Sequence, residues 1–124
     1  MRKITAALLL AALGTLAHAE GEREHRPVSV TVSGGQIDDL DDVHTTADEG
    51  ALVWVIGTKG YRFAQGNGID IQSGGKHACR TSQDGQRVRC AKAGHRRGER
   101  FKYEVNVIGT DGQPLNLDPF ILSD

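Results

Sequence analysis

The chain has almost no methionine and few aromatic residues. Of its 124 residues only Met1 is methionine, and aromatic side chains make up 5%. A blue-copper centre usually takes methionine as its weak axial ligand. A surface for single-stranded nucleic acid usually places aromatic rings between its basic residues. These two shortages argue against a blue-copper centre, and we expect no nucleic-acid partner.

Long apolar runs are also missing beyond the first residues. The basic start Met1-Arg-Lys3 precedes the apolar run Ile4–Leu16, and Ala17-His-Ala19 is a small-x-small cleavage site. This order is typical of a secretory signal peptide, so we predict a signal peptide at residues 1–19. The run is too short to span a bilayer, and no later stretch is longer, so we expect no transmembrane segment.

The common motifs of enzymes are absent as well. The sequence contains no P-loop, no Rossmann glycine pattern, no CxxC pair and no Gly-x-Ser-x-Gly elbow. The carboxylates of Asp38–Asp42 lack the apolar surroundings that separate the pKa values of a catalytic pair, and their spacing does not fit an EF-hand. We therefore expect a protein without enzymatic activity.

The two cysteines are placed symmetrically about Asp84-Gly85. This dipeptide favours a two-residue type I′ hairpin, in which Cys79 lies directly opposite Cys90. Opposed Cα atoms are then about 4.5–5.5 Å apart, a separation that a disulfide accepts. We predict a Cys79–Cys90 disulfide. Because disulfides persist in oxidising compartments, it agrees with a periplasmic or secreted protein.

The same register gathers positive charge on one side of the hairpin. Arg80 lies opposite Arg89 and next to the Ser82–Arg87 pair, so three arginines share a face. Guanidinium groups bind carboxylate, phosphate and sulfate through paired hydrogen bonds. We predict a site for an acidic protein, glycan or lipid headgroup at Arg80, Arg87, Arg89, Arg96 and Arg97. The alternatives are a solvated face and an internal match between the basic segment Lys76–Lys102 and the acidic segment Asp38–Asp42.

Short apolar segments separated by turns run from residue 28 to the end of the sequence. Ala51–Ile56 is continuously apolar and suits a strand buried on both faces, whereas Phe101–Val107 alternates and has one buried face. A three-residue loop at Thr110–Gly112 keeps apolar side chains opposite one another in the hairpin that follows. Pro119 predicts an edge or terminal strand at Leu115–Leu122.

About seven such strands without a long amphipathic helix predict an all-β protein. The fold class is an antiparallel β-sandwich of immunoglobulin-like or cupredoxin-like shape with one disulfide. We expect residues 20–27 to be a flexible lead-in and residues 28–124 to form a single domain. Trp54, Tyr61 and Phe63 are expected to pack in the core, with an aromatic binding platform as the alternative.

Several segments in the second half of the chain support a resemblance. They are Gly60-Tyr-Arg-Phe63, Asn67-Gly-Ile69, the two cysteines, Phe101–Val107 and Leu117-Asp-Pro-Phe-Ile121. Together they resemble small exported bacterial β-sandwich proteins, a largely uncharacterised group. The resemblance implies a fold and a compartment, and it implies no catalytic residue.

Two functions follow from these observations. The first is an exported, non-enzymatic binding or structural module that meets an anionic partner through its basic hairpin face. The alternative is a periplasmic protein of cupredoxin-like shape that binds copper or another metal. Its ligands would come from His44, His77, Cys90 and His95, with Cys90 available only as a free thiolate.

Overall fold

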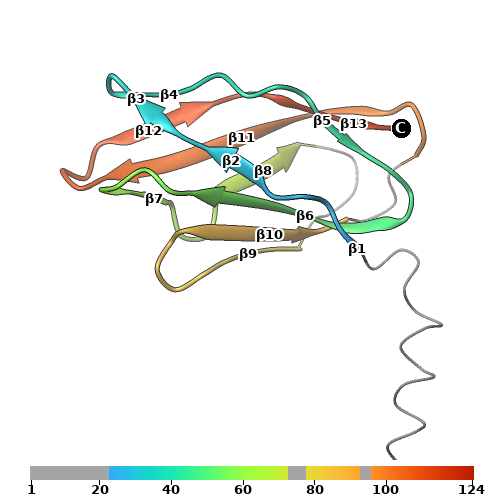
Figure 1. Cartoon of the computed structure of the whole chain (residues 1–124), viewed down its shortest axis with the longest axis horizontal. Helices are drawn as coiled ribbons and strands as arrows, with labels where there is room; N and C mark the ends of the chain where they lie inside the picture. The colour runs from blue at the N-terminus through green and yellow to red at the C-terminus, as the bar shows by residue number, and fades with distance from the viewer. Residues whose placement is uncertain (1–22, 73–77, 93–95) are drawn as a thin grey trace, which may run out of the picture.

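A computed structural model describes residues 23–72, 78–92 and 96–124, which are strands and loops (Figure 1). The predicted signal peptide at 1–19 lies outside the described residues. The strands are β1 (Arg23–Glu24), β2 (Val28–Val30), β3 (Val32–Ser33), β4 (Gln36–Ile37), β5 (Val43–Thr45), β6 (Glu49–Ile56), β7 (Tyr61–Phe63), β8 (Ile69–Gln72), β9 (Ala78–Thr81), β10 (Arg87–Ala91), β11 (Arg100–Gly109), β12 (Pro114–Leu117) and β13 (Phe120–Ser123).

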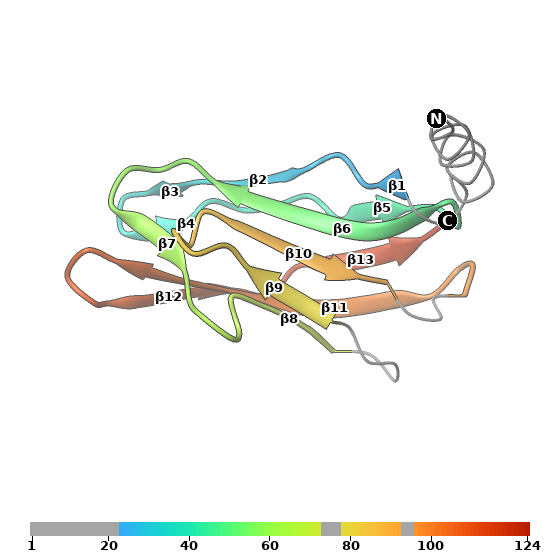
Figure 2. The same cartoon turned by 90° about the horizontal axis from the view of Figure 1, so that it is seen from below.

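Two sheets form the layers of a sandwich (Figure 2). The β6 sheet has the order β1-β6-β10-β9, and β2 also pairs with β6. The β11 sheet has the order β12-β11-β13-β5, and β7 and β8 pair with the other edge of β11. The all-β sandwich is therefore confirmed. The structure has more strands than the seven predicted, because the long strands β6 and β11 each pair along one edge with two short strands in succession.

The core lies between these layers and contains the largest apolar side chains. Trp54, Phe63 and Tyr103 are fully buried, and Tyr61 packs against them from the margin. Trp54 Nε1–H donates a hydrogen bond of 3.1 Å to Tyr103 Oη, and the two ring centroids are 5.1 Å apart. Burial raises the pKa of the Tyr103 hydroxyl to about 12. Core packing is thus the role of Trp54 and Phe63.

The cysteine hairpin has the predicted register but a different turn. Cys79 pairs with Cys90 and Arg80 with Arg89, and the disulfide has formed. Gly85 has a φ of 73°, but no residue other than glycine has a positive φ in the described chain, so Asp84 does not adopt the type I′ geometry. Instead the Asp84 carboxylate accepts hydrogen bonds from Ser82 Oγ and Gln86 N–H, which stabilises a longer loop with the same midpoint.

A type I′ arrangement occurs elsewhere, between β3 and β4. Ser33 pairs with Gln36, and the two residues between them, Gly34 and Gly35, have φ values of 59° and 77°. Both central residues of a type I′ turn need a positive φ, which glycine adopts without steric cost. The short return strand β4 was not predicted from the sequence.

The second predicted hairpin is confirmed, and its continuation is corrected. Val107 pairs with Leu115, and Gly112 has a φ of 82°, as the three-residue loop requires. Pro119 divides the following strand into β12 and β13. β12 lies at an edge of the sheet, as predicted, whereas β13, the last strand, does not, because β5 pairs with it in parallel on the side away from β11. Tyr103 N–H donates to Pro119 O, so this position lacks only the bond that the proline nitrogen cannot donate.

The start of the described chain is also corrected. Arg23–Glu24, assigned from the sequence to a flexible lead-in, forms β1 and pairs with β6 in parallel, and His25 N–H donates to Ala51 O. An edge segment held by backbone hydrogen bonds and ion pairs needs no apolar side chain of its own. The sheets are therefore mixed, with parallel pairs at β1–β6, β2–β6 and β5–β13.

Candidate functional site

Strand alternation places three of the predicted arginines on one surface. In β10, Val88 and Cys90 are fully buried, so Arg87 and Arg89 point away from the core. Arg80 of β9 lies directly opposite Arg89 and therefore points to the same side. All three are exposed. These residues, together with Glu24, are called the outer arginine face.

Glu24 supplies a carboxylate to this face from β1, which pairs with the edge of β6 opposite to β10. One carboxylate oxygen accepts from Arg89 Nε at 2.6 Å, and the other accepts from Arg87 Nη2 at 3.2 Å. The side chain of Glu24 is 40% exposed. The two arginines therefore share a single carboxylate. Charge-assisted bonds of this kind hold the carboxylate in a defined position.

An apolar floor lies under this ion-pair cluster. Val53 is fully buried although its side chain points to the outer side of the β6 sheet, where it lies opposite Arg89. Ala51 is likewise fully buried and lies opposite Glu24 and Ala91. Long arginine side chains commonly cover apolar surface with their aliphatic stems. The predicted burial of β6 on both faces is thus confirmed.

Arg80 differs from the other two arginines. No carboxylate lies within ion-pair distance of its guanidinium in the part of the chain that the structure describes. With Thr81, Ser82, Arg87 and Arg89 it lines a surface hollow of about 230 Å³. Arg80 therefore remains the cation of this face that is not neutralised.

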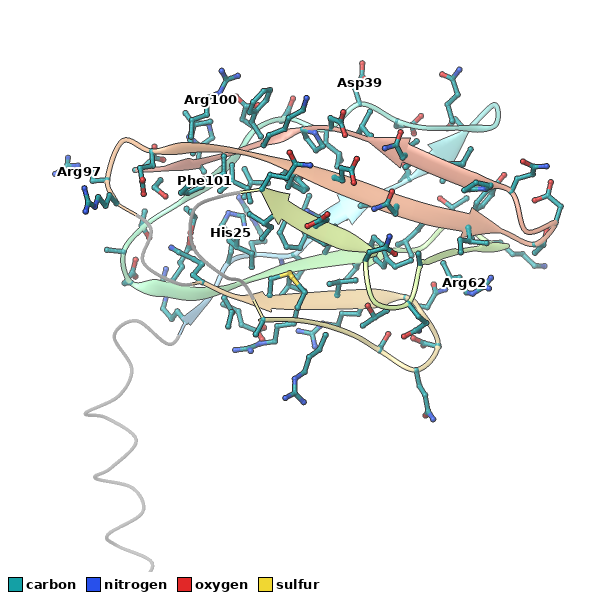
Figure 3. All side chains as sticks on the ribbon, turned by 180° about the vertical axis from the view of Figure 1, so that it is seen from behind. His25, Asp39, Arg62, Arg97, Arg100 and Phe101 are labelled. Carbon is teal, nitrogen blue, oxygen red and sulfur yellow. A yellow bond between two sulfur atoms is a disulfide. The ribbon has the colours of Figure 1, made fainter. Side chains whose placement is uncertain are left out.

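Arg96 and Arg97 lie apart from the outer arginine face. They precede β11 in a loop that is attached to the opposite sheet, since Gly98 N–H donates to Ser123 O at 2.6 Å. Arg96 N–H donates to the Glu99 carboxylate, and Figure 3 shows Arg97 projecting from one end of the sandwich. The structure brings together three of the five predicted arginines, while these two form a separate basic loop.

The internal charge match was predicted with the wrong acidic partner. Asp38 accepts hydrogen bonds from Thr31 Oγ1 and Ser33 Oγ. Among the described residues, no ion pair joins Asp38–Asp42 to the basic segment. The basic segment instead pairs with the carboxylates of Glu24 and Asp118. The Asp118 carboxylate lies 3.7 Å from Lys102 Nζ.

Glu24 was missed because it lies in a short charged segment with no apolar periodicity. The only signal in the sequence was the negative charge of Glu24, which is opposite to the charge of the basic hairpin. That signal does not say which of several acidic residues will reach the hairpin. The parallel pairing of β1 with β6 makes the choice, because it sets Glu24 opposite Ala51, from where its side chain reaches Arg87 and Arg89.

Lys92 belongs to the basic segment but has a structural role. Its Nζ donates to Thr45 Oγ1 at 2.8 Å and to Thr46 O at 2.7 Å. Partial burial lowers its pKa, against the opposing effect of Glu49 and Asp48. The ammonium group ties the end of β10 to the β5–β6 turn and contributes little to an external surface.

The alternative metal site has no assembled ligand set in the described ranges. Cys90 is bonded to Cys79, and His44 Nδ1 lies 3.1 Å from the Asp124 carboxylate. His77 and His95 lie outside the described residues. Among those that are described, no three His, Cys, Asp or Glu side chains are grouped so that they could hold a metal ion.

Comparison with known proteins adds no relative to this picture. No family model, no curated protein and no solved structure matches the chain. Across residues 23–72, 78–92 and 96–124, no helix is long and apolar enough to cross a membrane. Any assignment of function therefore rests on the chemistry of the outer arginine face.

Proposed function

We propose that this protein is an exported, non-enzymatic module that binds a carboxylate-bearing partner through the outer arginine face. The observation that supports this most directly is the carboxylate of Glu24, held between Arg87 and Arg89 at 3.2 and 2.6 Å. The face thus has a geometry suited to carboxylates. An acidic protein is the partner class that this chemistry favours.

The charges of the face support an external partner in addition to Glu24. The face carries three guanidinium groups and one carboxylate, which pairs with two of them, so the face keeps positive charge after its internal pairing. Arg80 is open to a carboxylate from outside, and an incoming acid can also replace Glu24, which is partly exposed. Binding of this kind weakens as salt screens the exposed charges.

The proposed compartment is the periplasm or the cell exterior. The Cys79–Cys90 disulfide agrees with an oxidising environment outside the cytoplasm. The predicted signal peptide at 1–19 supports the same location.

The proposal is tested by two double variants of equal charge. We expect Arg80→Ala/Arg89→Ala to bind poly-L-glutamate about tenfold more weakly than the wild type. Arg96→Ala/Arg97→Ala removes the same charge from the separate basic loop and is the matched control, with less than a twofold change expected. Isothermal titration calorimetry at two salt concentrations measures both. Equal losses in the two variants, or no binding by the wild type, would contradict the proposed site.

A further inference from the structure

The β6 sheet ends in β1 and β2 on one side and in β9 on the other. β1 and β2 pair with β6 and with no other described strand. At the opposite edge, β9 pairs with β10 and with no other described strand. A strand with an unpaired edge presents backbone donors and acceptors to any extended chain that approaches it.

The register shows which backbone groups of β9 face outward. Ser82 N–H donates to Arg87 O at 2.8 Å, so Ser82 and Arg87 are a hydrogen-bonded pair of the ladder. Hydrogen-bonded and non-hydrogen-bonded pairs alternate in an antiparallel ladder. The backbone of Arg80 therefore bonds to β10, while the N–H and C=O groups of Cys79 and Thr81 point to the open edge.

The side chains of β9 add a charge requirement to this open edge. Arg80 projects onto the outer arginine face, where it is the cation without a carboxylate partner in the described chain. At the opposite edge, β1 is an extended segment whose Glu24 reaches Arg87 and Arg89. The protein therefore already contains one extended segment whose carboxylate is held by arginines of this face.

A second copy of this chain does not meet the requirement. If β9 paired with β9 of another molecule around a two-fold axis near Arg80, both copies of Arg80 would lie side by side on one face, next to both copies of Arg89. Like charges in neighbouring positions of a sheet are destabilising. The charge of β9 favours a partner of opposite sign.

We propose that the partner is an acidic extended segment of another protein, which adds to the β6 sheet as a strand along β9. Its backbone bonds to Cys79 and Thr81, and a glutamate or aspartate at the position beside Arg80 pairs with that arginine. This inference rests on the proposed function and specifies how the partner is held. Strand addition uses main-chain hydrogen bonds for affinity and alternate side chains for specificity.

The test compares two synthetic peptides that carry the same charge. One alternates glutamate with valine. The other is identical except that the backbone nitrogens of its valines are methylated, which removes donors without changing any carboxylate. A third peptide, methylated at the glutamates, covers the other strand orientation. Strand addition predicts that at least one methylated peptide binds the disulfide-bonded protein at least tenfold more weakly than the unmodified peptide.

Amide hydrogen exchange supplies a readout specific to β9. In the complex with the unmodified peptide, the amide of Cys79, of Thr81 or of both is expected to become protected, whereas Arg80 N–H is protected with and without peptide. Thr81→Pro removes an outward N–H, and it is expected to abolish this protection while the disulfide and the circular dichroism spectrum stay intact.

The outcomes separate this inference from the proposed function. Equal affinity for all three peptides, with unchanged exchange at Cys79 and Thr81, overturns strand addition and leaves a purely electrostatic arginine site. Failure of every peptide to bind overturns both. If Thr81→Pro does not fold, the peptide comparison and the wild-type exchange data still decide the question.

Discussion

The two faces of β6 and β10 are built from alternate residues of the same strands, yet they are held by different forces. On the inner face, Leu52, Trp54, Val88 and Cys90 are fully buried in the core. On the outer face, Arg87 and Arg89 are exposed and meet Glu24. We expect the inner face to determine stability, while the proposed binding is assigned to the outer face. The following variants test that division.

The largest expected effect is on the inner face, at the disulfide. Cys79 and Cys90 close a loop with a sequence separation of 11 residues. In the chain-entropy model such a loop is worth about 3 kcal/mol. We expect Cys79→Ala/Cys90→Ala to lower the free energy of unfolding in urea by about that amount. A loss below about 1 kcal/mol would show that the ladder alone fixes this hairpin.

Alkaline pH tests the buried hydroxyl of the same core. The folded pKa of Tyr103 is about 12, against an ordinary value of 10.0. Between these values the unfolded chain loses the proton while the folded protein keeps it, so stability falls as pH rises. The expected slope is about 1.4 kcal/mol per pH unit. Urea titrations from pH 9 to 12 measure it, with Tyr103→Phe as the reference that lacks this component.

A smaller effect is expected from Tyr103→Phe at neutral pH. The substitution keeps the ring but leaves Trp54 Nε1–H without its acceptor. A buried donor that loses its partner costs about 1–3 kcal/mol. Thermal unfolding followed by tryptophan fluorescence measures the change, and Tyr61→Phe at the margin of the core is the control. Equal stability of the two variants would mean that water reaches Trp54.

The smallest effect on stability is expected on the outer face. Glu24→Gln weakens two partly exposed ion pairs, so the expected loss of stability is only a few tenths of a kcal/mol. We expect Glu24→Gln to bind poly-L-glutamate more tightly than the wild type, because Arg87 and Arg89 become available to the ligand. Glu104→Gln removes the same charge from β11 and is the control. A large loss of stability with unchanged binding would break the division between the faces.

Local patterns predicted much of the fold. Asp84-Gly85 and the cysteines fixed the register of β9 and β10, and matching apolar faces fixed that of β11 and β12, as the structure confirms. The predicted turn type was wrong, yet the register was right, because the register depends on the midpoint of a loop and not on its length. Hydrogen bonds from Ser82 and Gln86 to Asp84 select the longer loop.

Pairing between distant segments could not be predicted in this way. β1, β4 and β5 are two or three residues long, which is too short for an apolar period to be visible. The candidate site shows the same limit. Its arginines follow from hairpin register, whereas Glu24 reaches them only because β1 pairs with β6 across a long stretch of sequence.

The parallel pairing of β5 with β13 has a consequence for how the protein folds. Residues 43–45 pair with residues 121–123, so this part of the β11 sheet is completed only after nearly the whole sequence has been synthesised. Closing so large a loop costs entropy before the contacts form, and chains dominated by such pairings fold in milliseconds to seconds. Until residues 121–123 are available, β5 lacks the strand with which it pairs in the described part of the chain.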